Sequence, residues 1–318
     1  MKIISFSEIQ DLNISPKICY EWVEEMLMHK NEVILPAKIS LHLENNAFFN
    51  VMPCLLPHSD TGGVKIITRQ ANRAPSLDSQ IMLYDYKTST PKALMDGNWI
   101  TTMRTGAVAA HTIKHLANED FYEVGIMGLG NTGRATMKVL LDMYPEKQMK
   151  IKVLKYKDQH ILFKDYFKGE SGNDFPNAEF IFVDNYKEVV ESSDVVISAV
   201  TYAENDFCEA KYFKEGCLVV AVHLRGFLSC DLSFDKVFCD DIGHVNGFKY
   251  FNKWKYCAEV ADVVTKKAKG RENKSERIIA YNVGLSMHDI NYADKIYKMC
   301  SKAGQDISLE PPTNKFWI

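Results

Sequence analysis

Two patterns of apolar residues divide the first third of the chain. Apolar side chains recur every three or four positions over residues 16–30, which begin with a proline, and this spacing predicts an amphipathic helix. Residues 34–92 hold short apolar or alternating runs broken by Asn, Gly, Pro and Ser, which is typical of strands and turns. Residues 100–117 return to helical spacing, with Thr101 and Thr102 as candidate caps. The first third is therefore predicted to be an α+β unit.

The pattern of apolar residues changes near residue 118. Short runs of Val, Ile, Leu and Ala alternate with helical segments, starting with a strand at 124–127 and a helix at 131–144. Apolar strands that alternate with helices predict a parallel sheet covered on both faces. The expected fold class is α/β, with a doubly wound domain at residues 118–288 and a further helix at 288–304.

Composition narrows the class of protein. The 318 residues suggest two domains, because a domain averages roughly 150 residues. A net charge of −3 provides no basic field for a nucleic acid, and no apolar run is long enough for a membrane helix. The start of the chain turns polar too early for a secretory signal. Eight cysteines without a CxxC pair, and without the His and Cys spacing of a zinc site, predict reduced thiols in a cytoplasmic protein with no metal.

A glycine-rich turn follows the strand at 124–127. The segment Gly128-Leu129-Gly130-Asn131-Thr132-Gly133 has the spacing GxGxxG and precedes a helix. In dinucleotide-binding folds the first glycine allows a tight turn, the second lets the pyrophosphate approach, and the third lets helix and strand pack closely. The alternative is a turn with no ligand. The surrounding strands and helices favour dinucleotide binding.

The end of the next strand bears on which dinucleotide binds. An acidic residue about 20 positions after the glycines suits the 2′-hydroxyl of NAD, whereas a basic one suits the 2′-phosphate of NADP. Lys155 and Lys157 occupy this region, which slightly favours NADP, although Asp158 suits NAD if the strand ends later. Solvated lysines without a cofactor role are the other interpretation.

Two cations stand in segments that are expected to be buried. Lys65 lies in the strand-like run GGVKIIT, and Arg104 lies in the alanine-rich helix. A buried cation is costly unless it is paired with an anion, and an arginine can hold a carboxylate with two parallel hydrogen bonds. The anion is either a substrate carboxylate or a protein acid such as Asp96. Spacing alone does not separate these possibilities.

Motifs along nearly the whole chain resemble the ornithine cyclodeaminase/μ-crystallin family of NAD(P)-dependent oxidoreductases. The resemblance implies a Rossmann domain and a split α+β substrate and dimerisation domain, here residues 1–117 completed by 289–318. It also implies a homodimer. The matching segments are GVK at 63–65, MDGxWITxxRTGA at 95–107, the GxGxxG turn, DVVISAVT ending at Thr201, and NVGLSMHDI at 282–290. The candidate cofactor-binding residues are Gly128, Gly130, Asn131, Thr132, Gly133, Lys155, Lys157, Thr201 and Thr105.

The resemblance also assigns the substrate side. The family's carboxylate-binding arginine falls at Lys38, which keeps the charge but loses the planar fork, and its lysine and helix arginine fall on Lys65 and Arg104. The aspartate that serves as base in the cyclodeaminases falls at Arg225. A guanidinium stays protonated and cannot accept a proton, so cyclodeamination by the usual route is disfavoured.

Arg225 then has two interpretations. Beyond the carboxyl end of a strand it suits a second anionic group of the substrate. Alternatively, it points to solvent or pairs with Asp240 or Asp241. The neighbouring His223 is a candidate substrate ligand and proton carrier with an ordinary pKa near 6.5, or else a structural residue.

The sequence predicts an NAD(P)-dependent oxidoreductase acting on the C–N bond of an amino or imino acid. Lys65, Arg104 and Arg225 are the candidate catalytic residues, and Lys38, Lys65, Arg104 and His223 the candidate substrate ligands. One alternative is ornithine cyclodeaminase, which forms proline and ammonia. Another is the subgroup of N-(2-amino-2-carboxyethyl)-glutamate dehydrogenases of diaminopropionate synthesis, which is similar at Lys38, at Asp240 and Asp241, and at Gly270-Arg271-Glu272. A third is a non-catalytic binding protein like the μ-crystallins.

Overall fold

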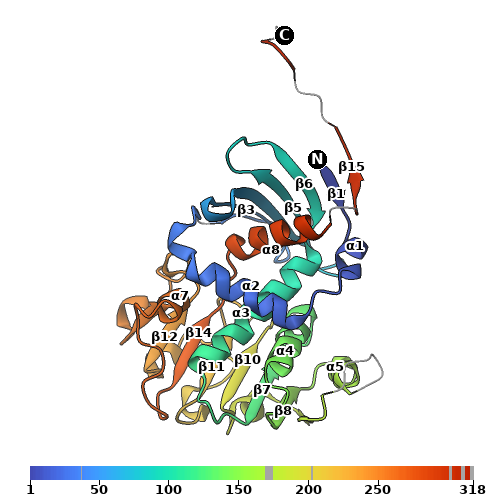
Figure 1. The fold of residues 1–318 in the computed structure, drawn as a ribbon. Coiled ribbons are helices and arrows are strands. Elements are labelled where there is room, and N and C mark those ends of the chain that lie inside the picture. The colour runs from blue at the N-terminus through green and yellow to red at the C-terminus, as the bar shows by residue number, and fades with distance from the viewer. Residues whose placement is uncertain (37, 169–174, 202, 301–302, 309–311, 316–318) are drawn as a thin grey trace. The chain divides into compact units, whose positions relative to one another are not determined.

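The computed structural model describes the chain in two compact units (Figure 1). It describes residues 1–318 except 37, 169–174, 202, 301–302, 309–311 and 316–318. The first unit comprises Met1–Ile14, Asn31–Thr101 and Ser286–Ile318, and the second comprises Ser15–Lys30 and Thr102–Leu285. These divisions differ from the expected borders at residues 117 and 288, because the helix at Pro16–Met28 and most of the alanine-rich helix pack within the second unit.

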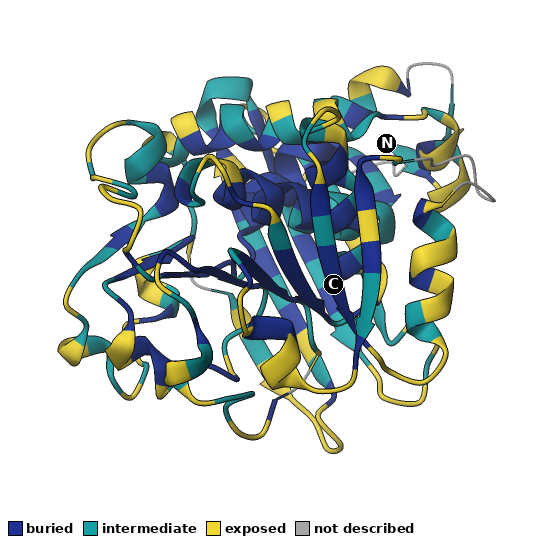
Figure 2. Cartoon of the chain, turned by 90° about the horizontal axis from the view of Figure 1, so that it is seen from below, coloured by how far each residue is buried: buried dark blue, intermediate teal, exposed yellow. Residues whose placement is uncertain are grey.

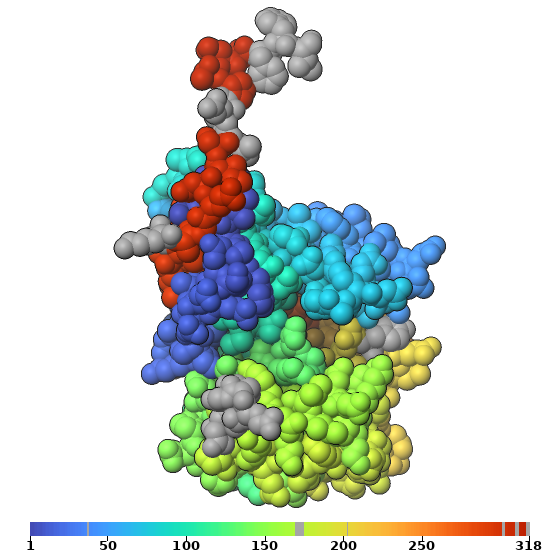
Figure 3. Space-filling model, turned by 90° about the vertical axis from the view of Figure 1, so that its right-hand side faces the viewer, coloured from blue at the N-terminus to red at the C-terminus, as the bar shows by residue number. Residues whose placement is uncertain are grey.

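The first unit is built on a mainly antiparallel sheet. Among the described residues the strand order is β15-β1-β6-β5-β4-β3-β2, in which only the β1–β6 pair is parallel. Figure 3 shows the C-terminal segment beside the N-terminal one, as the pairing of β1 with β15 requires. The strands are β1 (Lys2–Ile4), β2 (Ile39–His42), β3 (Phe48–Leu56), β4 (Thr61–Arg69), β5 (Leu77–Asp85), β6 (Pro91–Asp96) and β15 (Gln305–Asp306).

Helix α8 (Ser286–Met299) covers one face of this sheet by packing on β3, β4 and β5 (Figure 1). Contact is close at Gly63, where an added Cβ would lie 2.6 Å from the Cδ1 of Ile290. Because side chains alternate along a strand, Lys65 shares the face of Gly63 that meets α8. The short helix α1 (Phe6–Asp11) is preceded by the N-cap residue Ser5, which forms a capping box with Glu8.

The second unit contains the predicted parallel sheet. Its order among the described residues is β13-β12-β14-β11-β10-β7-β8-β9, with every pair parallel. Four of its strands, β10, β11, β12 and β14, are buried at every residue, which explains their continuous apolar sequences (Figure 2). The strands are β7 (Glu123–Met127), β8 (Met149–Leu154), β9 (Ala178–Val183), β10 (Val195–Ser198), β11 (Leu218–Ala221), β12 (Lys236–Cys239), β13 (Cys257–Glu259) and β14 (Ile278–Tyr281).

Helices pack against this sheet and against one another. Helix α2 contacts α4 and α7 within the second unit. The parallel sheet and its helices confirm the predicted α/β, Rossmann-type fold class. The helices are α2 (Pro16–Met28), α3 (Asn98–Leu116), α4 (Asn131–Met143), α5 (Gln159–Phe167), α6 (Tyr186–Val190) and α7 (Val260–Val264). Short 3-10 turns cover Lys30–Glu32, Pro57–Ser59, Ala210–Tyr212, Cys230–Ser233, Ile242–His244 and Phe251–Lys253.

The predicted start of α3 was wrong. The helix begins at Asn98, where the Oδ1 of Asp96 accepts a hydrogen bond from the backbone N of Asn98 at 2.8 Å. Thr101 lies inside the first turn, and its hydroxyl lies 2.9 Å from that of Ser79 instead of capping the helix. Asp96, two residues before Asn98, therefore caps the helix in place of the predicted threonines.

Two further expectations concern the whole chain. Within the described residues, none of the helices has both the length and the apolar character needed to cross a membrane. All eight cysteines are free thiols, as the sequence predicts.

Candidate functional site

The glycine turn has the geometry that its spacing predicts. Gly128 adopts φ +87°, and an added Cβ would lie 2.3 Å from the carbonyl carbon of Ala199. A Cβ at Gly133 would lie 2.1 Å from the Gly128 oxygen, so the helix and the turn pack too closely for a side chain. At Gly130, by contrast, no described atom would lie within 4 Å of an added Cβ. The turn is tight at its two ends and open at its centre.

This open centre coincides with the start of α4. Gly130 is the N-cap residue, and no side chain caps its amides. Gly130 and Asn131 are exposed, and Thr132 is half-buried. Free amides at a helix N-terminus with the positive end of the helix dipole suit a phosphate group. The residues present therefore fit a dinucleotide pyrophosphate.

Two other candidate cofactor residues belong to neighbouring elements of the same unit. Thr105 lies on α3, next to Gly106, where an added Cβ would lie 2.5 Å from the carbonyl carbon of Ala135 on α4. Thr201 is exposed and follows β10, which pairs with β7 directly before the glycine turn. The residue after Thr105 thus packs against α4, and Thr201 follows a strand that neighbours β7. The role of both threonines in cofactor binding stays a prediction.

Lys155, one of the two candidate lysines after β8, forms an ion pair with Asp184. The Nζ of Lys155 lies 2.8 Å from the Oδ1 of Asp184, and both side chains are exposed. Strands β8 and β9 pair side by side, so the residues that follow them emerge together. Lys157 is also exposed, with φ +47°. A cation and a carboxylate therefore share the region where the ribose of a dinucleotide is expected.

Lys65 forms a fully buried ion pair in the first unit. Its Nζ lies 2.8 Å from the Oδ1 of Asp289 on α8, and both side chains are 0% exposed. The sequence left the partner open and named Asp96, which instead holds the start of α3. Burial, with the nearby charge of Asp289, raises the pKa of the Cys54 thiol to about 12. The pair lies between the sheet and α8, where a lone ammonium would be strongly disfavoured.

Arg104 belongs to a second buried cluster, in the second unit. Gly284 has φ +83°, and an added Cβ there would lie 2.6 Å from an Nη of Arg104. The carboxylate of Asp240 accepts hydrogen bonds from the Gly284 amide at 3.0 Å and from the Asn282 side chain at 2.8 Å. Burial raises the pKa of Asp240, while these bonds and the charges of Lys30 and Arg104 lower it. The cluster fixes the backbone against which the guanidinium lies.

His223 and Arg225 follow β11 in the second unit. Arg225 is exposed. Asp240 and Asp241, which the sequence named as one alternative for its partners, bond to Asn282 and Lys30, respectively. The Nε2 of His223 lies 2.6 Å from the Ser198 hydroxyl. Burial lowers the pKa of His223 to about 4, so the expected value near 6.5 was wrong and the imidazole is neutral at pH 7.

The predicted substrate residues are thus divided between the two units. Lys38, which directly precedes β2 and is half-buried, lies in the first unit with Lys65. Arg104, His223 and Arg225 lie in the second unit. The convergence of these cations on one substrate stays a prediction.

Comparison with known proteins identifies the family. The family model described as ornithine cyclodeaminase/mu-crystallin matches residues 2–304. The chain belongs to this family.

Several proteins with assigned names resemble the chain over most of its length. A nodulation efficiency protein of Rhizobium meliloti is 27% identical and covers 85% of each chain. The N-((2S)-2-amino-2-carboxyethyl)-L-glutamate dehydrogenase of Staphylococcus aureus is 28% identical over 70% of this chain and 68% of its own. The structure of the Δ1-pyrroline-2-carboxylate reductase of Thermococcus litoralis with NADH and L-proline has a TM-score of 0.85 and 25% identity, covering 96% of this chain and 100% of that one.

Sequence reasoning missed the partners of the family's cations. Asp289 was noted as part of a motif and not as the partner of Lys65. Asp240, Asn282 and Gly284 were not connected to Arg104. One signal was available: Asn282, Gly284 and Asp289 all stand in the segment NVGLSMHDI, which precedes and begins a helix.

Proposed function

We propose that this family member is an NAD(P)-dependent oxidoreductase that acts on the C–N bond of an amino or imino acid. The observation that carries the proposal is the glycine turn, closed at Gly128 and Gly133 and open at Gly130, on a parallel sheet of the matched family. The named relatives, a dehydrogenase of an amino-acid derivative and a reductase of a cyclic imine, support the same class of reaction.

The second unit supplies the cofactor site in this proposal. The amides of Gly130 and Asn131 hold the pyrophosphate at the start of α4, and Thr105, Thr132 and Thr201 line the same site. The bound nicotinamide supplies or receives the hydride. Lys155 meets the 2′-phosphate if the cofactor is NADP, whereas Asp184, its partner, suits the ribose hydroxyls of NAD.

Lys65 and Arg104 bind the carboxylate of the substrate. Both are buried cations: Lys65 is paired with Asp289, and Arg104 lies against the backbone at Gly284, so we expect little reorganisation when they accept an anion. Asp289 keeps the ammonium of Lys65 in place, and the Lys65 Nζ already donates a hydrogen bond to the Asp289 Oδ1. Lys38 adds a third cation from the start of β2. The first unit is accordingly the substrate and dimerisation domain.

Arg225 favours some of the reactions considered for this chain over others. As a permanent cation it cannot take a proton from an attacking amine, which disfavours cyclodeamination of ornithine. Its exposure after β11 instead suits a second acidic group on the substrate. A dehydrogenase like the Staphylococcus aureus relative, whose named substrate carries more than one carboxylate, is the favoured alternative within the class. A non-catalytic binding protein remains the alternative outside it.

We also propose a cytoplasmic homodimer that forms through the sheet of the first unit. Helix α8 covers one face, while Ile39, Leu41 and Leu43 at the β2 edge are each more than half exposed. Apolar side chains at the edge of a sheet favour association with a second chain. The eight free thiols fit a reducing compartment.

Cofactor binding and turnover, measured separately, test this proposal. The purified chain is titrated with NADPH and with NADH while the thermal midpoint and the protein fluorescence are followed. Binding of at least one cofactor is expected, and an absence of binding by both would contradict the proposal. Lys65→Ala and Arg104→Ala should then abolish turnover of the wild-type substrate and leave the cofactor dissociation constant unchanged.

A further inference from the structure

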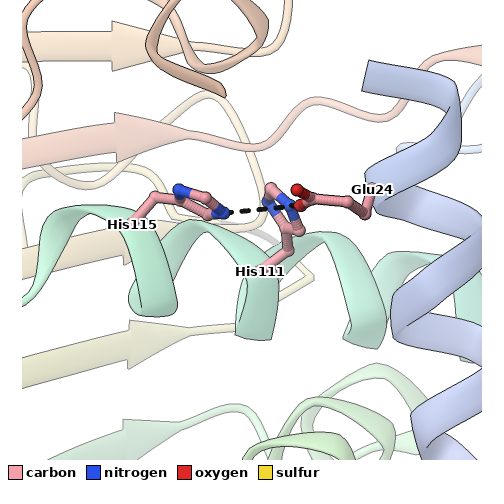
Figure 4. A group of neighbouring side chains, drawn as sticks. All are labelled: Glu24, His111 and His115. Atoms are coloured by element: carbon pink, nitrogen blue, oxygen red, sulfur yellow. Dashed lines mark hydrogen bonds and ion pairs between the residues drawn. The ribbon is translucent and has the colours of Figure 1, made fainter. Parts of the chain in front are cut away.

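Three potential metal ligands lie together in the second unit, away from the glycine turn in sequence. His111 and His115 stand four residues apart on α3 and therefore share one face of the helix. Figure 4 shows both imidazoles beside Glu24, which projects from α2. One ligand atom from each of the three residues lies within 4.8 Å of the other two.

The contacts within this cluster match the spacing of a tetrahedral metal site. The Nε2 of His111 bonds to the Oε2 of Glu24, and the Nε2 of His115 lies 3.4 Å from the same oxygen. Zinc bonds of about 2.0–2.1 Å in a tetrahedron place neighbouring ligand atoms about 3.3 Å apart. The His115–Glu24 separation is already that of two ligands of one ion, and the His111–Glu24 contact needs only to open.

Two buried ring nitrogens of the cluster do not form hydrogen bonds within the described part of the chain. Within the described part of the chain, the buried Nδ1 of His111 and Nε2 of His115 have no hydrogen-bond partner. The two rings stack with their centroids 4.4 Å apart. The Nε2 of His115 has only the 3.4 Å contact with Glu24, and a metal ion would give it a direct bond.

The side chains of the cluster differ in their exposure to solvent. His111 is fully buried, while the side chains of His115 and Glu24 are 26% and 39% exposed, which leaves a route from solvent.

We propose that Glu24, His111 and His115 form a binding site for a divalent transition metal of the zinc class, with water as the fourth ligand. Two imidazoles and one carboxylate are a donor set that zinc accepts and that calcium and magnesium do not favour. The ion ties α2 to α3 inside the second unit. The proposal is independent of the proposed enzymatic function, and it departs from the expectation of no metal, which considered only combined Cys and His spacings.

The test uses the full chain without a histidine tag, stripped of metal by a chelator and titrated with zinc chloride. At a zinc concentration 100 times the dissociation constant, the thermal midpoint should rise by about 5 °C. Glu24→Gln and His115→Asn should remove most of this rise, because each deletes one ligand with little change in volume. Glu21→Gln, which changes the same charge at an exposed position one turn earlier on α2, should keep it.

Cobalt reports the geometry in the same proteins. The wild type and Glu21→Gln should show the visible absorption bands of tetrahedral cobalt, and the two ligand variants should not. If zinc fails to shift the wild-type midpoint, or shifts all four proteins equally, the cluster is only a hydrogen-bonded contact between α2 and α3, and the proposal is wrong.

Discussion

At the scale of single residues, the buried pair of Lys65 and Asp289 makes the sharpest prediction. Asp289→Asn leaves a buried ammonium without its counter-charge, and such a loss costs about 3–5 kcal/mol of the free energy of unfolding. Turnover should fall as well, because the variant no longer positions the Lys65 Nζ. Denaturant unfolding and initial rates measure the two effects.

An exposed ion pair provides the control for this variant. Lys87 and Asp60 lie 2.6 Å apart at the surface of the same unit, and Asp60→Asn should leave unfolding almost unchanged. If Asp289→Asn lowers the free energy of unfolding no more than Asp60→Asn does, the Lys65–Asp289 pair does not stabilise the fold as predicted.

His223 makes the stability depend on pH. Its pKa is lowered from 6.5 to about 4 in the folded chain, so the unfolded chain binds more protons between these values. Stability should therefore decrease by up to about 3 kcal/mol as the pH falls from 6.5 to 4. His223→Gln should flatten the dependence in this window, as measured by denaturant unfolding at several pH values. An unchanged slope in the variant would show that another group is responsible.

At the scale of elements, the glycine turn separates folding from binding. Gly133→Ala places a methyl group against the Gly128 oxygen and should destabilise the chain by about 1–3 kcal/mol. Gly130→Ala meets no described atom and should fold normally, yet weaken NAD(P)H binding because the methyl group stands where the pyrophosphate approaches. Thermal midpoints and cofactor titrations separate the two outcomes. Equal cofactor affinity in Gly130→Ala and the wild type would contradict the placement of the pyrophosphate.

Some helices and strands could be predicted from the sequence, and others could not. The strand at Glu123–Met127 and helix α4 were predicted almost to the residue, because a buried strand, a glycine turn and an amphipathic helix follow one another there. Helix α5 and strands β9 and β14 were not predicted. Strand β14 follows a long irregular segment and joins the sheet between β11 and β12, which depends on contacts distant in sequence.

The candidate site was predictable to a similar degree. The cations Lys65 and Arg104 could be found because a charge in an apolar run is unusual. Their neighbours Asp289 and Gly284 could not, since more than 170 residues separate each from its partner and only the tertiary structure brings them together. Glu24 and His111 are 87 residues apart, and they too are brought together only by the tertiary structure.

At the scale of the whole molecule, the β2 edge predicts association. The wild type should be a dimer in solution, and Leu41→Asp should shift it toward the monomer by placing a charge at the proposed interface. Leu162→Asp is a matched control, because Leu162 is equally exposed, at 57%, on α5 of the other unit. Light scattering coupled to gel filtration gives the mass of each protein. A monomeric wild type, or equal dissociation of both variants, would contradict the proposed interface.

The central claim is that hydride passes between a nicotinamide and the carbon of a C–N bond. The chain is incubated with NADPH or NADH deuterated at the transferable position, together with cyclic imino acids and with 2-oxo acids plus ammonia or amino acids. Mass spectrometry then follows the amino-acid products. The account predicts one deuterium at the α-carbon of the product, lost in Lys65→Ala and Arg104→Ala. Cofactor binding without deuterium transfer to any member of the panel would contradict it and indicate a binding protein.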